Sequence, residues 1–185
     1  MQIIAGKYRG HKISTPKGSN TRPTSSRLRE ALFNIVQSYI EDTAFLDLYA
    51  GSGAMGLEAL SRGAKKAAFV DHSKEALQCM QSNAKHLKVE PLVTILNGDV
   101  FRMLEKLARS SQFDIIYADA PYSEDDAPSL RLLQFFDESN LLKGDGMLFI
   151  EDIQPKHDAE LKNLHLISTR NAGTSYLHQY QKGKQ

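Results

Sequence analysis

The stretch that most constrains the fold runs from residue 44 to residue 56 and reads A-F-L-D-L-Y-A-G-S-G-A-M-G. Its first half is an apolar run of strand length, and Gly51, Gly53 and Gly56 lead into a helical pattern that begins at Leu57. A strand that turns on glycines into a helix exposes backbone N–H groups and the positive end of the helix dipole. The pattern predicts a nucleotide-type binding site, although G-x-G-x-x-G serves dinucleotides and S-adenosylmethionine alike.

Two acidic residues narrow the choice of ligand. Asp47 lies four positions before Gly51, so we expect its carboxylate near the end of the strand, beside the ligand. A carboxylate there would repel a pyrophosphate and attract the amino group of a methionine moiety. Asp71 follows the next apolar run at about the 20-residue distance typical of a carboxylate that binds ribose hydroxyls. We therefore expect S-adenosylmethionine; the alternative for Asp47 is a capped or solvated turn residue.

The rest of the chain alternates between strand and helix patterns. This alternation predicts an α/β fold with a mostly parallel sheet and helices on both faces. A closing hairpin, residues 165–170 and 175–180, predicts an antiparallel edge on that sheet. The expected strands are 66–70, 92–96, 113–118 and 146–150, and the expected helices are 54–62, 73–87, 100–109 and 128–138.

Length and composition favour a single globular domain. The chain has 185 residues, of which 41% are hydrophobic and 24% charged, so the composition indicates neither a disordered nor a fibrous chain. No apolar run reaches the roughly 20 residues of a membrane span, and the N-terminus lacks a signal-peptide pattern, so we expect a cytoplasmic protein. The single cysteine, Cys79, is expected to be a small buried side chain, and the six scattered histidines predict no metal site.

The charges are distributed unevenly along the chain. Residues 1–29 carry seven Lys or Arg and no Asp or Glu, a charge of +7, whereas the other 156 residues carry 16 basic and 22 acidic side chains, a charge of −6. A basic arm on an acidic body indicates a polyanionic partner, unless the arm is merely a solvated tail. Tyr8 could stack on bases, in a small hairpin over residues 3–13. A helix is expected to begin near Thr24 or Ser25. The expected RNA-binding residues are Lys7, Tyr8, Arg9, Arg22, Thr24, Arg27 and Arg29.

The chemically most informative stretch is F-D-I-I-Y-A-D-A-P-Y, residues 113–122. Its strand delivers Asp119 to the sheet edge where ligands of open α/β folds bind. Asp119 could accept one hydrogen of an exocyclic base amine and the carbonyl of Ala120 the other, while Tyr122 stacks on the base. Pro121 would hold Ala120 in an extended conformation. The amine lone pair would then point at a sulfonium methyl group, with no metal required. The alternative is an ordinary Asp-Ala-Pro turn at the end of a strand.

Together these motifs resemble the RsmD family, bacterial 16S rRNA (guanine-N2)-methyltransferases of the Rossmann-like class I type. The resemblance covers I-I-A-G-K-Y-R-G, R-P-T-S-S-R-L-R-E-A-L-F-N, L-D-L-Y-A-G-S-G-A-M-G-L-E-A-L-S-R-G, the Asp71 region and the closing hairpin. It implies a seven-stranded sheet whose last strand is antiparallel. It also implies S-adenosylmethionine as the methyl donor and, as acceptor, a guanine of small-subunit rRNA in a partly assembled ribosomal particle.

The resemblance and the residue patterns together define the expected site. The N-terminal basic hairpin and helix, residues 1–43, would form an RNA-binding extension of a catalytic core over residues 44–185, and the protein is expected to be a monomer. Asp99 could accept a hydrogen bond from the cofactor adenine, or be a turn-and-cap aspartate instead. The expected catalytic residues are Asp119, Ala120, Pro121 and Tyr122. The expected cofactor-binding residues are Asp47, Tyr49, Gly51, Ser52, Gly53, Asp71, His72, Asp99 and Val100.

Three other functions stay open at this point. An adenine-N6 methyltransferase would use the same pair of acceptors, because they suit any exocyclic amine. An RNA-binding assembly factor that has lost its chemistry would keep the basic arm. A nicotinamide-dependent oxidoreductase would keep the glycine turn, but Asp47 and the lack of a hydride-transfer constellation disfavour it.

One departure from the family pattern generates a test. The family's catalytic loop usually reads D-P-P-[FY], and here Ala120 takes the place of the first proline. Alanine keeps the carbonyl but frees the φ angle and adds an N–H group. If the looser loop limits catalysis, Ala120→Pro will raise methyl-transfer turnover several-fold in a steady-state assay. An unchanged turnover would reject the loop-rigidity hypothesis.

Overall fold

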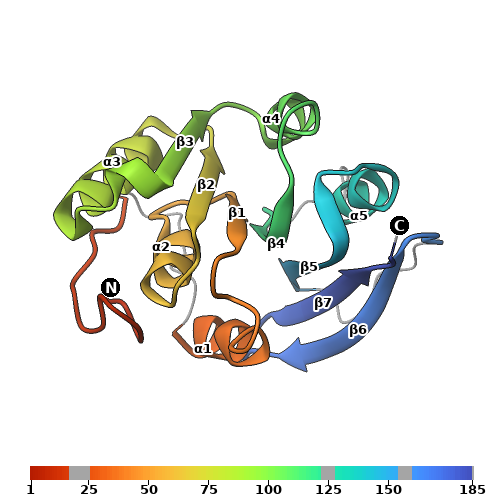
Figure 1. Ribbon diagram of the computed structural model, residues 1–185, viewed down its shortest axis with the longest axis horizontal. Helices are drawn as coiled ribbons and strands as arrows, with labels where there is room; N and C mark the ends of the chain where they lie inside the picture. Colours follow the sequence, from red (N-terminus) through yellow and green to blue (C-terminus); the bar gives the residue numbers. More distant parts are fainter. Residues whose placement is uncertain (17–25, 122–127, 154–159, 185) are drawn as a thin grey trace.

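The computed structural model describes residues 1–16, 26–121, 128–153 and 160–184. Helices and strands alternate along most of the chain, as the sequence pattern predicts (Figure 1). In chain order the elements are α1 Ser26–Ile35, β1 Ala44–Leu48, α2 Ala54–Ser61, β2 Lys66–Asp71, α3 Lys74–Leu87, a 3-10 turn Glu90–Leu92, β3 Val93–Asn97, α4 Val100–Leu107, β4 Phe113–Asp119, α5 Pro128–Glu138, β5 Leu142–Asp152, β6 Leu164–Asn171 and β7 Tyr176–Lys182.

The seven strands form one sheet in the order β3-β2-β1-β4-β5-β7-β6. The neighbouring pairs among β1 to β5 are parallel, and β7 runs antiparallel to both β5 and β6. The expected mostly parallel sheet with one antiparallel strand is therefore confirmed. The structure adds that β7 is the interior strand of the closing hairpin and β6 the edge. The reason is burial, because β7 carries the buried Leu177 and Tyr180 while most of β6 is exposed.

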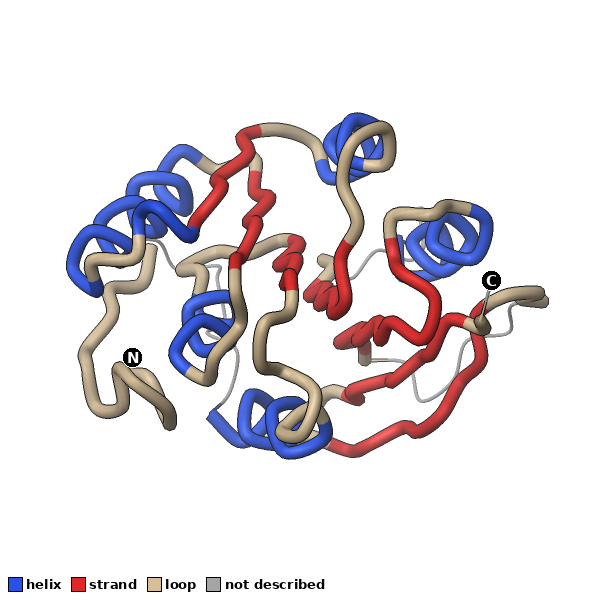
Figure 2. The backbone as a smooth tube through the Cα atoms, viewed as in Figure 1, coloured by secondary structure: helices blue, strands red, loops and turns tan. Residues whose placement is uncertain are grey.

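Two apolar layers sandwich the sheet. Helices α1, α2 and α3 lie on one face, and α4 and α5 lie on the other (Figure 2). Strand β1 shows the alternation clearly, because Phe45 contributes to the first layer and Leu46 and Leu48 to the second. All five residues of β1 are buried, which explains why its sequence is a continuous apolar run interrupted by Asp47 alone.

The predicted boundaries hold within two residues for α2 to α5 and for β2 to β4. Strand β5 is longer than predicted. It begins at Leu142, and its pairing with β4 is irregular between Phe113 and Ile115, so the polar residues 143–146 bulge out of the ladder. In the sequence such a polar stretch resembles a loop, although β5 pairs with β4 on both sides of it.

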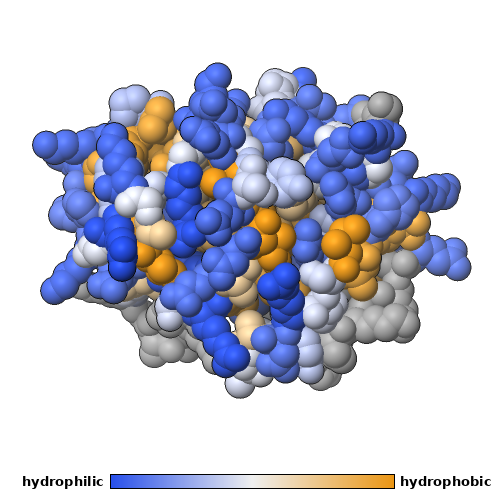
Figure 3. Space-filling view, turned by 60° about the horizontal axis from the view of Figure 1, so that its bottom comes forward, coloured by the Kyte–Doolittle hydropathy of each residue, from blue (hydrophilic) through white to orange (hydrophobic). Residues whose placement is uncertain are grey.

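The surface carries few large apolar side chains. On the face shown in Figure 3 hydrophilic residues dominate, and apolar atoms show in separate areas. None of the described helices has the length and apolar character that a bilayer span requires. The large hydrophobic side chains exposed in the described parts of the chain are Tyr39, Leu92, Ile153, Leu166 and Ile167.

The N-terminal segment is a fixed part of the core. The expected hairpin exists as a short antiparallel pairing, with a bridge between Gln2 and Lys12 and a hydrogen bond of 3.0 Å from the Ile3 amide to the His11 carbonyl. Ile3 and Ile13 are buried in the same layer as α1. Helix α1 begins at Ser26, and the predicted start at Thr24 or Ser25 lies outside the described residues.

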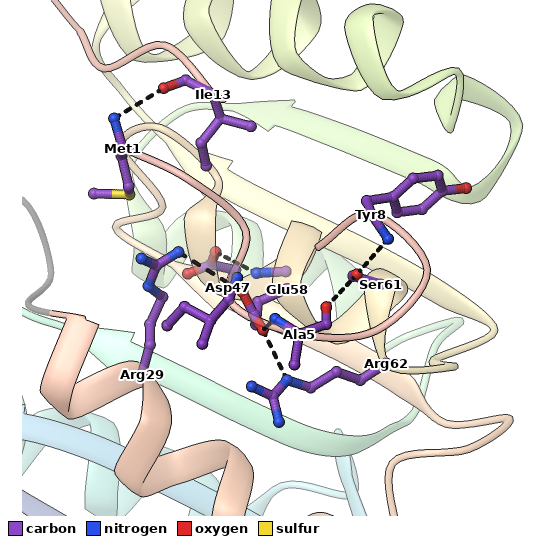
Figure 4. Close-up of polar contacts among 11 residues, drawn as sticks. Met1, Ala5, Tyr8, Ile13, Arg29, Asp47, Glu58, Ser61 and Arg62 are labelled. Carbon is purple, nitrogen blue, oxygen red and sulfur yellow. Dashed lines mark hydrogen bonds and ion pairs between the residues drawn. The ribbon is translucent and has the colours of Figure 1, made fainter. Parts of the chain in front are cut away.

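One buried carboxylate holds this segment on helix α2 (Figure 4). Glu58 is 0% exposed, and its two oxygens accept hydrogen bonds from the backbone amides of Ile4, at 2.8 Å, and Ala5, at 3.0 Å. The guanidinium groups of Arg62, at 2.8 Å, and Arg29, at 3.8 Å, neutralise its charge. Because Glu58 joins α1, α2 and the N-terminal segment, residues 1–16 and the start of α1 are fixed to the core.

Replacing this carboxylate tests its structural role. Glu58→Ala leaves two backbone amides without their acceptor and a buried arginine without its counter-charge. The free energy of unfolding should fall by about 3–5 kcal/mol, the usual cost of breaking a buried ion pair. Urea titration followed by circular dichroism measures it. The matched control is Glu105→Ala on α4, an exposed position where we expect a change of at most about 0.5 kcal/mol. A loss of less than about 1 kcal/mol for Glu58→Ala would contradict the assigned role.

Candidate active site

The turn between β1 and α2 has an unusual backbone. Tyr49, Gly51 and Gly53 all have positive φ angles, of 57°, 55° and 76°. For Tyr49 this left-handed conformation costs on the order of 1–3 kcal/mol, and such strain is typical of functional sites. Gly53 is the N-cap residue of α2 and makes no side-chain capping hydrogen bond. The turn therefore presents backbone N–H groups and the helix dipole together, as the sequence predicts.

Asp71 at the end of β2 braces this turn. Its Oδ2 accepts a hydrogen bond of 2.9 Å from the Gly51 amide, and its Oδ1 accepts one of 2.9 Å from the Ser73 amide. The side chain lies where the sequence predicts, beside the glycine turn. Each oxygen of a carboxylate has a second lone pair, so the group retains capacity to accept a further donor. The neighbouring His72 side chain is 81% exposed.

Asp47 lies deeper than expected. The residue is only 1% exposed, and its Oδ2 accepts a hydrogen bond of 3.0 Å from the Gly56 amide in the first turn of α2. Burial raises the pKa of the Asp47 carboxyl well above its usual value, and the negative charges of Asp119 and Asp71 raise it further. The Gly56 amide thus holds the carboxylate beneath the first turn of the helix. A contact with the ligand stays a prediction.

The third glycine of the motif serves packing. A Cβ atom at Gly56 would lie 2.4 Å from Cε1 of Phe69 on β2. A Cβ atom at Gly51, in contrast, would meet no heavy atom within 4 Å. Gly56 therefore allows α2 to approach the sheet, whereas Gly51 borders open space at the turn.

Sequence reasoning missed Asn83 on α3. Its side chain is 2% exposed; the amide nitrogen donates to the carbonyls of Ser52, at 2.9 Å, and Ser14, at 3.0 Å. Its oxygen accepts a hydrogen bond of 2.8 Å from the Ser14 amide. Asn83 thereby ties the glycine turn to the chain that leaves the N-terminal hairpin. The signal in the sequence was that Asn83 is a polar residue on the helix face that also carries Cys79 and Met80. Cys79 itself is buried, as predicted.

The end of β4 lies beside the glycine turn. In the ladder between β1 and β4 the last residue of β1, Leu48, pairs with Ala118, so Asp119 follows next to Tyr49. The negative charge of Asp119 contributes to the raised pKa of Asp47, which also indicates that the two carboxylates are close. Ala120 is partly buried and Pro121 is exposed, whereas the predicted stacking residue Tyr122 lies outside the described residues.

A polar group beside Asp119 was also missed by the sequence. Glu151 at the end of β5 accepts hydrogen bonds from the Tyr117 hydroxyl, at 2.6 Å, and from Ser175 Oγ, at 2.8 Å. Burial raises the pKa of the Tyr117 hydroxyl well above its usual value. On the opposite face of the sheet, the Ser129 hydroxyl donates to the carboxylate of Asp152. These contacts join β4, β5, α5 and the turn before β7, and no local sequence pattern predicts them.

Asp99 has the structural role that was the alternative in the sequence. It is the N-cap residue of α4, and its Oδ1 accepts a hydrogen bond of 3.0 Å from the Arg102 amide. The next residue, Val100, is 4% exposed. The side chain of Asp99 is exposed at the edge of the sheet, and its contact with an adenine stays a prediction.

The basic residues of the arm divide into two groups. Lys7, Arg9 and Arg27 are exposed, and the Lys7 ammonium lies 5.3 Å from the ring centroid of a half-buried Tyr8. Arg29 is a correction, because it is 2% exposed and paired with Glu58, so it cannot hold RNA phosphates in this structure. Its helical position on the face of Leu28 and Phe33 carries it into the core. Two further predicted RNA-binding residues, Arg22 and Thr24, lie outside the described residues.

The hairpin tip and the glycine turn lie at opposite ends of α2. The Lys7 amide donates to the carbonyl of Ser61, the last residue of that helix, at 2.7 Å, while Gly53 caps its start. Eight helical residues span roughly 12 Å at 1.5 Å per residue. The hairpin tip and the glycine turn are therefore separated by roughly the length of α2.

No group of three His, Cys, Asp or Glu residues within the described ranges could hold a metal ion. The groups that the structure shows at this edge are carboxylates, backbone groups and a helix N-terminus. They suit the orientation and deprotonation of a nucleophile beside a ligand held by the glycine turn.

The strand order, the single antiparallel β7 and the glycine turn after β1 define the Rossmann-like fold of class I methyltransferases. Comparison with known proteins adds the family. The chain belongs to the family described as Conserved hypothetical protein 95, the RsmD family, whose model matches residues 1–181.

Individual relatives agree over nearly the whole chain. The Haemophilus influenzae ribosomal RNA small subunit methyltransferase D is 30% identical over 182 residues, which cover 98% of this chain and 93% of that protein. Bacillus subtilis YlbH is 36% identical over 163 residues, covering 88% and 85%. The solved structure of Escherichia coli yhhF superimposes with a TM-score of 0.87 at 28% identity and covers 100% of this chain and 99% of that one. An RNA methyltransferase from Salinibacter ruber, solved with S-adenosyl-L-homocysteine, shares the fold, with a TM-score of 0.69 at 14% identity over 89% of this chain and 95% of that chain.

Proposed function

We propose that this protein transfers a methyl group from S-adenosylmethionine to the exocyclic N2 amine of a guanine in small-subunit ribosomal RNA. The observation that carries the proposal is the adjacency of two features at one sheet edge. The left-handed glycine turn follows β1, and Asp119 ends the neighbouring strand β4. The relatives named as ribosomal RNA small subunit methyltransferases support an rRNA acceptor.

The residues around the turn suit S-adenosylmethionine. The open space at Gly51 leaves room for a ligand against the backbone, and the second lone pairs of Asp71 can accept ribose hydroxyls. Asp99 is exposed at the neighbouring strand end, where it can accept from the adenine amine. When bound, the cofactor supplies a methyl group already activated by the sulfonium charge. The remaining proposed contacts are Asp47, Tyr49, Ser52, Gly53, His72 and Val100.

The acceptor base is oriented by the chain after β4. The Asp119 carboxylate and the Ala120 carbonyl accept the two hydrogens of the amine, and Tyr122 stacks on the ring. Orientation of this kind directs the amine lone pair, which conjugation otherwise draws into the ring, toward the methyl group. Asp119 is also the base placed to take the proton that the amine loses as the new N–C bond forms.

The N-terminal residues 1–43 form the RNA-binding extension of a single domain, and residues 44–185 form its catalytic core. The exposed Lys7, Arg9 and Arg27 neutralise phosphates, with Arg22 and Thr24 in the segment between them, and Tyr8 stacks on an unpaired base. The protein acts as a monomer in the cytoplasm on a partly assembled small subunit.

Removal of the proposed base tests the reaction. Asp119→Ala should lower methyl transfer from tritiated S-adenosylmethionine to small-subunit particles, purified from cells lacking the gene, by roughly 100-fold or more. The affinity for S-adenosylhomocysteine, measured by calorimetry, should change less than about threefold, because the glycine turn is untouched. Asp145→Ala, an exposed position in the bulge of β5, is the control.

We expect mass spectrometry of the nucleosides to identify the product as N2-methylguanosine. N6-methyladenosine would contradict the assigned base. Incorporation at background level in both the wild-type protein and Asp119→Ala would favour an RNA-binding assembly factor, whereas wild-type incorporation that survives in Asp119→Ala would reject Asp119 as the base.

The two outer glycines of the turn separate ligand binding from folding. Gly51→Ala places a methyl group in the open space at the turn, so S-adenosylhomocysteine should bind at least about tenfold more weakly, while the unfolding free energy falls by only about 1–2 kcal/mol. Gly56→Ala drives a methyl group into the Phe69 ring and should cost about 1–3 kcal/mol of stability. Calorimetry and urea unfolding measure the two effects. Unchanged affinity in Gly51→Ala would place the cofactor elsewhere.

A further inference from the structure

Asp119 has a second carboxylate beside it at the edge of the sheet. In the parallel ladder of β4 and β5, Asp119 and Glu151 are Cα partners, and neighbouring strands lie about 4.8 Å apart. The two side chains point to the same face, because Tyr117 and Phe149, two residues earlier on each strand, both pack in the layer of α1 to α3. Two hydrogen-bond acceptors therefore lie side by side where the base that receives the methyl group is proposed to bind.

The Glu151 carboxylate is fixed in its orientation. The Tyr117 hydroxyl donates to Oε2 and the Ser175 hydroxyl to Oε1. Tyr117 is 1% exposed, and its raised pKa keeps the hydroxyl protonated, so it acts as the donor. Beyond these two bonds to described residues, each carboxylate oxygen has a second lone pair, and Glu151 is only partly buried. The arrangement holds an oriented acceptor with spare capacity next to Asp119.

The chemistry of the bases decides which one suits two adjacent acceptors. Guanine carries its N1–H donor directly beside the N2 amine, so its edge is a row of donors. In adenine and cytosine the ring nitrogen next to the amine is an acceptor, and its lone pair would face a carboxylate. We propose that Glu151 selects guanine by accepting the N1–H hydrogen bond while Asp119 holds the N2 amine. This inference rests on the proposed function and names the group that makes the site specific for guanine rather than adenine.

The test compares two substrate bases that differ in the hydrogen-bonding edge next to the N2 amine. Small-subunit particles are reconstituted with 16S rRNA that carries either guanine or 2-aminopurine at the methylated position. 2-Aminopurine keeps the N2 amine but lacks the N1–H group. A hydrogen bond to a charged group is worth roughly 10- to 150-fold in binding or rate, so the wild-type protein should prefer guanine by at least this factor in kcat/KM.

Variants at Glu151 then give a graded prediction. In Glu151→Leu, which removes the acceptor, the preference for guanine over 2-aminopurine should fall by roughly 10- to 150-fold. In Glu151→Gln, which keeps a neutral acceptor, it should fall by a smaller factor. The matched control is Asp152→Asn, the next residue on the same strand, whose side chain contacts Ser129 on the opposite face and should leave the preference unchanged.

The possible results distinguish the proposed role of Glu151 from the proposed methyltransferase function. If Glu151→Leu and Glu151→Gln slow both acceptors equally and the preference survives, Glu151 only positions Tyr117 and the inference is overturned. If Glu151→Leu does not fold, as judged by its thermal unfolding, Glu151→Gln alone decides. If the wild-type protein makes no N2-methylguanosine in the particle that carries guanine, the proposed function itself fails and the inference falls with it.

Discussion

The in-register parallel pairing of β2, β1, β4 and β5 is the constraint on which the rest of the site depends. It brings Asp71, the glycine turn, Asp119 and Glu151 to one edge of the sheet, although 80 positions separate the first of these residues from the last. This convergence concentrates negative charge. The raised pKa of the Asp47 carboxyl reflects this crowding of acidic groups, because burial and the acidic neighbours both disfavour its ionised form. A ligand with a cationic centre would relieve part of that repulsion.

Helix α2 connects the two halves of the proposed function. At its first turn, the Gly56 amide holds Asp47, and in its second turn Glu58 holds the N-terminal segment. Asn83 adds a second connection, between Ser14 and the glycine turn. The basic hairpin and the cofactor turn are therefore parts of one rigid arrangement. An RNA bound at the hairpin tip would therefore lie at a fixed distance from the sheet edge that holds the proposed active site, and the length of α2 sets that distance.

Local sequence patterns predicted most of the fold, because apolar periodicity and glycine placement act over a few residues. The glycine turn followed from this, as did the alternation of strands and helices, whereas the hydrogen bond by which Asp71 braces the turn was not predicted. The error on Arg29 arose because a count of charges treats every cation as exposed, whereas helical spacing places this residue on the buried face of α1. Asp47 lies deeper than expected because an amide nine residues along the chain captures its carboxylate. Helical spacing places Asn83 on the buried face of α3, but its partners and those of Glu151 could not be found locally, since they lie on strands and loops distant in sequence.

The most direct test is a crystal structure of this protein with S-adenosylhomocysteine. The account predicts that the ribose hydroxyls contact Asp71, that the amino acid end lies against the Gly51 turn, and that the sulfur faces the end of β4 where Asp119 and Ala120 stand. A ligand bound at another edge of the sheet would contradict it. So would an Asp119 carboxylate that turns into the interior, away from the sulfur.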